Sequence, residues 1–139
     1  FEDAVRTYTK AVKLLPDPEE EPVEPAMRKE AAVLLCNRAA ANMALGKAVP
    51  ALADAQLAAD FDESNWKAHW RTGIAFMMME PRIERSEKAV AAFQRTLDSP
   101  TLPAGERANA TEALERARYR LHEGRDALDM PDMAACAIC

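Results

Sequence analysis

Apolar side chains recur every three or four residues along most of the chain, and this spacing predicts helices. Over residues 1–15 one helix face carries Phe1, Ala4, Val5, Tyr8, Ala11, Val12 and Leu15. Further helices are expected over residues 27–45, 49–60, 65–79, 86–97 and 104–128. Prolines and a glycine separate them, namely Pro16, Gly46, Pro81, Pro100 and Pro103. Asp62 or Ser64 is expected to cap the helix over 65–79, and Ser86 to begin the helix over 86–97.

The helical segments repeat. Shifting the sequence by 34 residues brings Asn37 onto Arg71, Ala39 onto Gly73 and Ala41 onto Ala75. Small and aromatic residues also recur at fixed positions in three successive segments. The first segment has Ala4, Tyr8 and Ala11, followed by Pro16. The second has Ala39, Ala51, Ala55 and Ala58, and the third has Gly73, Ala89 and Phe93, followed by Thr96. Small residues let two helices approach closely, and an aromatic ring fills the space between successive pairs.

The 34-residue period and these small and aromatic positions resemble those of tetratricopeptide-repeat proteins. The resemblance implies an all-α solenoid of antiparallel helix pairs with a C-terminal capping helix. In this scheme residues 1–16 are the second helix of a truncated first repeat, and 17–26 are an acidic, proline-rich linker. Residues 27–63 and 64–99 form the second and third repeats, with an insertion near 80–84, and 104–128 is the capping helix. A tail follows over 129–139.

The charge and composition exclude several classes of function. With a net charge of -5, the chain lacks the basic surplus typical of nucleic-acid binding. It has no apolar run long enough for a membrane span and no secretory leader, and its three cysteines favour a reducing compartment. We therefore expect a cytoplasmic protein without a cofactor. It should be a monomer, although an unpaired first helix exposing Tyr8 and Val12 could lead to self-association.

Two cations and an amide are candidates for a binding site. Lys67 and Arg71 are four residues apart and so share one helix face, and Asn37 occupies the repeat position equivalent to Arg71. A lysine, a planar arginine fork and an amide donor suit a carboxylate. Such a pair on an exposed helix is more often a solvated face, so the spacing alone leaves both interpretations open.

The sequences around these residues, residues 35–40 and 66–73, resemble the carboxylate-clamp repeats of chaperone-binding cochaperones. The resemblance implies that Asn37, Lys67 and Arg71 hold the C-terminal Glu-Glu-Val-Asp peptide of cytosolic heat-shock chaperones. A further lysine and asparagine of that family would lie before Phe1. The expected groove positions are Val33, Cys36, Asn37, Ala40 and Met43 from one helix and Lys67, Trp70, Arg71, Ile74 and Met78 from the next.

The end of the chain offers a different chemistry. Cys136 and Cys139 are spaced as in Cys-x-x-Cys and resemble the first two zinc ligands of a RING-type domain. Zinc requires four ligands, so the chain alone holds no complete site, and two incidental thiols are the simpler interpretation. His69 and His122 have no partner spacing for a metal or for proton transfer and are expected to be surface or packing residues.

The sequence predicts a peptide-binding module rather than an enzyme, because no catalytic constellation occurs in it. The alternatives are a client-recruiting module of a multidomain enzyme (a RING-type ubiquitin ligase or a prolyl isomerase) and a scaffold for an unrelated partner.

Overall fold

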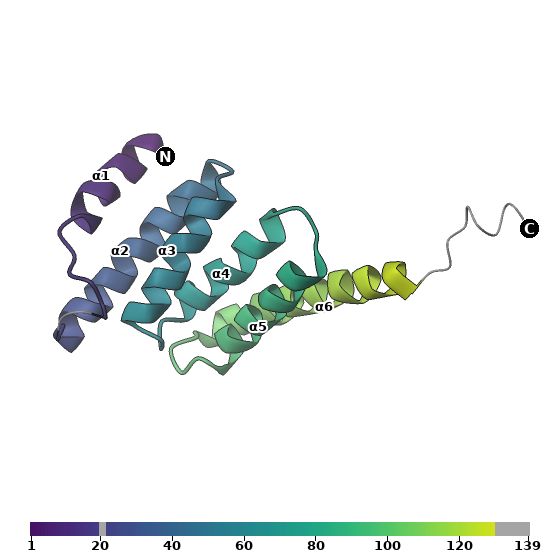
Figure 1. The fold of residues 1–139 in the computed structure, drawn as a ribbon. Coiled ribbons are helices and arrows are strands. Elements are labelled where there is room, and N and C mark those ends of the chain that lie inside the picture. The colour runs from purple at the N-terminus through teal and green to yellow at the C-terminus, as the bar shows by residue number, and fades with distance from the viewer. Residues whose placement is uncertain (20–21, 130–139) are drawn as a thin grey trace, which may run out of the picture.

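The computed structural model describes residues 1–19 and 22–129, and these form helices and connecting loops with no strand among them. Six α-helices occur in these residues: α1 (Glu2–Val12), α2 (Pro25–Ala44), α3 (Ala48–Phe61), α4 (Trp66–Met78), α5 (Ile83–Asp98) and α6 (Arg107–Asp129). A short 3-10 helix, η1 (Ala104–Glu106), precedes α6. Each α-helix packs against its neighbours in sequence, and α2 also contacts α4. Figure 1 shows them side by side in chain order, which confirms the predicted all-α solenoid of helix pairs.

Several helix ends differ from the prediction. The first helix ends at Val12, before Leu15, and the chain then turns through Lys13 and Leu14. The residue that caps α4 is Asn65, whose side-chain oxygen accepts a hydrogen bond from the Lys67 backbone N–H at 3.0 Å. The expectation of Asp62 or Ser64 at this position was therefore wrong.

The start of α5 was also predicted incorrectly. This helix begins at Ile83, because Arg82 is the last residue with extended backbone after Pro81. Ser86 consequently lies inside the helix and is buried rather than forming its first turn. After α5 the chain enters α6 through η1. Residue 104, the predicted first residue of the last helix, therefore begins a 3-10 turn, and α6 itself begins at Arg107.

The end of α2 was predicted correctly. Gly46 follows the helix with a φ of 73°, in the left-handed region that a residue with a side chain rarely adopts. Pro50 lies in the first turn of α3, where no backbone donor is needed.

The core consists largely of alanines and a few aromatic rings. One cluster joins α2, α3 and α4 through Ala31, Ala32, Leu35, Cys36, Ala58, Phe61 and Ala68. Another joins α4, α5 and α6 through Phe76, Ala89, Phe93, Leu114 and Ala117. The small and aromatic positions of the second and third repeats, and Thr96, are all buried, while Ala4, Tyr8 and Ala11 of α1 are only half-buried. Small side chains thus bring the helices close enough for the stack to bury its apolar faces.

No helix in the described part of the chain is both long enough and apolar enough to cross a bilayer. The last helix, α6, extends past α5 in Figure 1. Its final turns still contact α5, since Arg125 forms an ion pair with Glu87 at 3.2 Å, but Leu128 near the end of the helix is 75% exposed.

Candidate functional site

The predicted carboxylate patch lies where α2 faces α4. Asn37 is exposed on α2, Lys67 is exposed in the first turn of α4, and Arg71 is half-buried one turn further along. We call these three residues the carboxylate patch. The contact between α2 and α4 brings the two helices together.

Lys67 and Arg71 of α4 lie close enough to Cys36 of α2 to affect the pKa of its thiol. Its thiol is 1% exposed, so it belongs to the core and not to the groove surface where repeat spacing had placed it. Burial raises the pKa of this thiol above its ordinary value. The Arg71 guanidinium opposes that rise, first through its positive charge and then through a hydrogen bond to the thiol; the positive charge of Lys67 opposes it more weakly, and the negative charge of Asp62 adds to it slightly. Both cations of α4 therefore act on an atom one residue away from Asn37.

Arg71 has an unusual environment. Its Nη1 atom is buried and makes no hydrogen bond to any residue that the structure describes. Neither Arg71 nor Lys67 forms an ion pair within residues 1–19 and 22–129, although the chain as a whole is acidic. A buried donor on a charged group loses its hydration without compensation, which costs free energy until an acceptor reaches it.

Arg38 shows the opposite arrangement, although it follows Asn37 directly in sequence. Its guanidinium donates to both carboxylate oxygens of Asp54, at 2.8 and 2.6 Å, and to the hydroxyl of Thr9 at 3.4 Å. The Asp54 carboxylate raises the pKa of Arg38 mainly through this hydrogen bonding. The bidentate pair joins α2 to α3, the bond to Thr9 adds α1, and Arg38 is therefore a structural cation rather than a ligand-binding one.

The first turn of α4 is fixed by its neighbours. Asn65 caps it, and the Trp66 backbone N–H donates to the hydroxyl of Thr101 at 3.2 Å. The Lys67 ammonium lies 5.9 Å from the centre of the Trp66 ring, which suits a weak cation–π contact. The first two backbone N–H groups of α4, those of Trp66 and Lys67, thus both have hydrogen-bond acceptors, while the Lys67 side chain is exposed.

The apolar residues predicted for the site fall into two groups. Trp70 and Ile74 line one cavity of about 320 Å³ between α4 and α6, and Trp70 also packs on Phe93 with ring centres 5.4 Å apart. Ala40 on α2 is half-buried and Met78 is 41% exposed, and neither lines that cavity. Met77 and Met79 pack against the core, where flexible methionine side chains can fill irregular gaps.

The structure shows neighbours of the candidate site that the sequence did not indicate. The α6 side of the cavity, with Ala113 and Arg116, could not be assigned because the packing of the last helix is a tertiary property. The Arg38–Asp54 pair did leave a signal, since Asp54 lies in the centre of an alanine-rich helix. An acid in that setting generally needs a buried partner.

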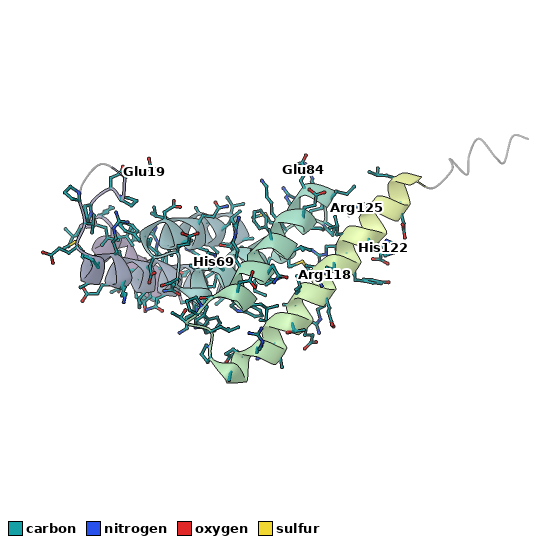
Figure 2. The ribbon with its side chains drawn as sticks, turned by 90° about the horizontal axis from the view of Figure 1, so that it is seen from below. Glu19, His69, Glu84, Arg118, His122 and Arg125 are labelled. Atoms are coloured by element: carbon teal, nitrogen blue, oxygen red, sulfur yellow. The ribbon has the colours of Figure 1, made fainter. Side chains whose placement is uncertain are left out.

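The remaining candidates are two histidines and a pair of cysteines near the end of the sequence. His69 is a packing residue: it is buried with Nε2 2.7 Å from the carbonyl oxygen of Glu63, whereas His122 is exposed beside Asp126 at 3.3 Å. Figure 2 shows His69 in the middle of the stack and His122 on α6. No group of three or more potential metal ligands occurs in residues 1–19 and 22–129. Cys136 and Cys139 lie outside the described residues, so the zinc hypothesis stays a prediction.

Comparison with known proteins supports the repeat assignment. No family model matches the chain. The chain is similar to the ER protein translocation subcomplex subunit sec67 of Schizosaccharomyces pombe, with 43% identity over 63 residues, which cover 45% of this chain and 32% of that protein. It is also similar to the small glutamine-rich tetratricopeptide repeat-containing protein 2 of Saccharomyces cerevisiae, with 32% identity over 117 residues, which cover 84% of this chain and 27% of that protein.

The chain therefore spans about a third of one relative and about a quarter of the other. Similarity over most of this chain to a protein named for its tetratricopeptide repeats, together with the stacked helix pairs, supports a tetratricopeptide-repeat domain. One relative is named for the ER, so the predicted cytoplasmic location stays a prediction.

Proposed function

We propose that this chain is a non-catalytic protein-interaction module that binds the acidic C-terminal peptide of heat-shock chaperones, of the Glu-Glu-Val-Asp type. Asn37, Lys67 and Arg71 would hold the terminal carboxylates. The observation that carries the proposal is the buried Nη1 of Arg71, a charged donor with no acceptor in the described chain.

Each of the three residues contributes something different. The Arg71 guanidinium presents a planar fork that matches the two oxygens of a carboxylate, and its partial burial strengthens the bond by excluding water. The exposed Lys67 ammonium supplies a mobile point charge, and the Asn37 amide donates without adding charge. Because neither cation has an acid partner among the described residues, the ligand does not need to displace an internal ion pair.

Similarity to a tetratricopeptide-repeat protein supports a protein partner. Neither relative is named as a ubiquitin ligase or a prolyl isomerase, so the similarity does not favour the alternative in which the chain serves such an enzyme.

The proposal is tested by titrating the chain with a fluorescent peptide ending in Glu-Glu-Val-Asp. The same peptide with an amidated C-terminus is the control for the carboxylate. Lys67→Ala and Arg71→Ala should each weaken binding by about 1.5–3 kcal/mol, the usual value for a hydrogen bond to a charged group.

The matched control variant is Arg118→Ala, which removes an exposed arginine of α6 outside the carboxylate patch. If only the carboxylate patch binds the peptide, this variant should bind it as tightly as the wild-type chain. Equal affinity for the free and the amidated peptide, or unaltered binding by both patch variants, would refute the proposal.

A further inference from the structure

A groove between α3 and α5 lies on the opposite side of α4 from the carboxylate patch. Its floor is formed by His69, Thr72 and Phe76 of α4, and its volume is about 840 Å³. At about 100° per residue, these three residues lie roughly 140° to 200° around the helix from Lys67, whereas Arg71 lies only about 40° from it. A ligand in this groove, which we call the α3–α5 groove, therefore leaves the carboxylate patch free.

The two walls of the α3–α5 groove carry opposite charges. One wall has Asp60, near the end of α3, and Glu63, in the turn that follows; the other has Lys88 and Arg95 of α5. All four residues are exposed, and none of them forms an ion pair within residues 1–19 and 22–129. The fold thus holds two acids and two bases on either side of an open space across which they do not meet.

The polar groups on the floor of the groove already have partners. Nε2 of His69 lies 2.7 Å from the carbonyl oxygen of Glu63, and the Thr72 hydroxyl donates to a backbone carbonyl of its own helix at 2.8 Å. Phe76 is buried, and the Lys88 ammonium lies 5.8 Å from the centre of its ring. Because the floor is satisfied internally, the charged walls decide what the groove attracts.

The residues between the charges are small. Ala91 stands between Lys88 and Arg95 on α5, and these two cations are seven residues, or about 10.5 Å, apart along the helix. On the opposite wall Ala59 lies beside Asp60. Small side chains let helices approach closely, and charges along the edges of a helix interface pair as they do in coiled coils. A trough of this kind between two helices therefore suits a third helix.

We propose that the α3–α5 groove docks a helix of a partner protein that carries basic residues along one edge and acidic residues along the other. The basic edge faces Asp60 and Glu63, and the acidic edge faces Lys88 and Arg95. These edges also fix the direction of the partner helix, because turning it end for end brings like charges together. The proposal is independent of the proposed function, since the groove and the carboxylate patch lie on opposite sides of α4. The chain can thus hold an acidic peptide and a second protein at once.

The test uses designed helical peptides of about 21 residues, or roughly six turns. They are acetylated and amidated, so they offer no terminal carboxylate to the patch. The mixed peptide has alanine on the face toward the groove, lysine along one edge and glutamate along the other. Two comparison peptides carry lysine along both edges or glutamate along both edges. In fluorescence anisotropy the mixed peptide should bind about tenfold more tightly than either comparison peptide, because each of these brings like charges together at one wall.

A fourth peptide tests whether the occupant is helical. It has the composition of the mixed peptide except for two central prolines, which break the helix. It should bind no more tightly than the comparison peptides.

Charge reversal assigns the binding to the groove. The double variant Lys88→Glu, Arg95→Glu makes both walls acidic, so it should lose the preference for the mixed peptide and bind the lysine-edged peptide most tightly. The matched control is Lys29→Glu, Arg118→Glu, which reverses two exposed cations that do not line the groove and should keep the wild-type preference. Lys67→Ala, in the carboxylate patch, should keep it as well. Far-UV circular dichroism shows whether each variant is folded.

Three results would overturn the docking site. One is equal affinity of the wild-type chain for the mixed and the comparison peptides, or no binding of the mixed peptide. Another is a folded Lys88→Glu, Arg95→Glu variant that still prefers the mixed peptide. The third is tight binding of the proline-containing peptide, which would rule out a helical occupant. Titration with the Glu-Glu-Val-Asp peptide is a separate measurement, so failure of one proposal is not mistaken for failure of the other.

Discussion

Replacing Gly73 with alanine tests whether the close approach of α4 and α5 determines the stability of the stack. An ideal Cβ on Gly73 would lie 2.5 Å from Cε1 of Phe93 and 2.7 Å from Cδ1 and Cζ. Carbon atoms in good contact are about 3.5–4.0 Å apart, so the new methyl group overlaps the ring by about 1 Å. The ring cannot easily move away, because Phe93 is fully buried and packs on Trp70.

The expected magnitude is a difference between two terms. Inserting a methyl group into a closely packed core costs about 1–3 kcal/mol. Alanine in a helix interior is favoured over glycine by about 0.5–1 kcal/mol, which offsets part of that cost. We therefore expect Gly73→Ala to lower the free energy of unfolding by about 0.5–2 kcal/mol.

Urea unfolding followed by far-UV circular dichroism measures this change. The matched control is Gly105→Ala, where a Cβ meets nothing within 4 Å and stability should stay the same or rise slightly. In a Phe93→Leu background the cost of Gly73→Ala should shrink, since the smaller side chain can yield. If Gly73→Ala were as stable as the wild-type chain, the argument from helix approach would be wrong.

The remaining predictions concern other contacts in the fold. Asp54→Ala should lower the free energy of unfolding by about 1.5–3 kcal/mol, because it leaves the half-buried Arg38 without its carboxylate partner, whereas the exposed Asp60→Ala should have little effect in the same urea titration. Asn65→Ala should cost about 1 kcal/mol through loss of the α4 cap, and a thermal melt compared with the wild-type chain would show it. Because burial raises the pKa of the Cys36 thiol, the unfolded chain releases this proton first as the pH rises above about 8.5, so stability falls through that range. Cys36→Ala should remove this part of the loss when urea unfolding at about pH 7 and pH 10 is compared, and an identical pH dependence in both proteins would contradict it.

The order and type of the elements follow from local signals. Apolar residues at three- and four-residue spacing predict the helices, and prolines and Gly46 predict their separation. The 34-residue repeat also indicates which small residues are buried, and Ala39, Ala55 and Gly73 are all buried in the structure. These features could be predicted because each depends on neighbours within one or two repeats.

Local signals were less reliable at helix ends. Asp62, Ser64 and Asn65 are all good cap residues within four positions, and the sequence offers no way to rank them. The choice of Asn65 is consistent with the contact between α4 and the loop at Thr101, which is far away in the sequence. Ser86 was misjudged for a similar reason, since its burial within α5 reflects the fold and not its own preference.

The sequence by itself determined the all-α class, the repeat stack and the identity of the candidate carboxylate-binding residues. The tertiary structure decided which arginine and lysine side chains lack an acidic partner and so could bind a carboxylate, because such partners come from residues far away in the sequence. Arg38 is satisfied by Asp54 from the next helix, while Arg71 keeps a buried donor without an acceptor in the described residues. The structure also placed α6 opposite Trp70 and so formed the cavity beside the patch. No local pattern encodes that contact, because it joins residues more than thirty positions apart.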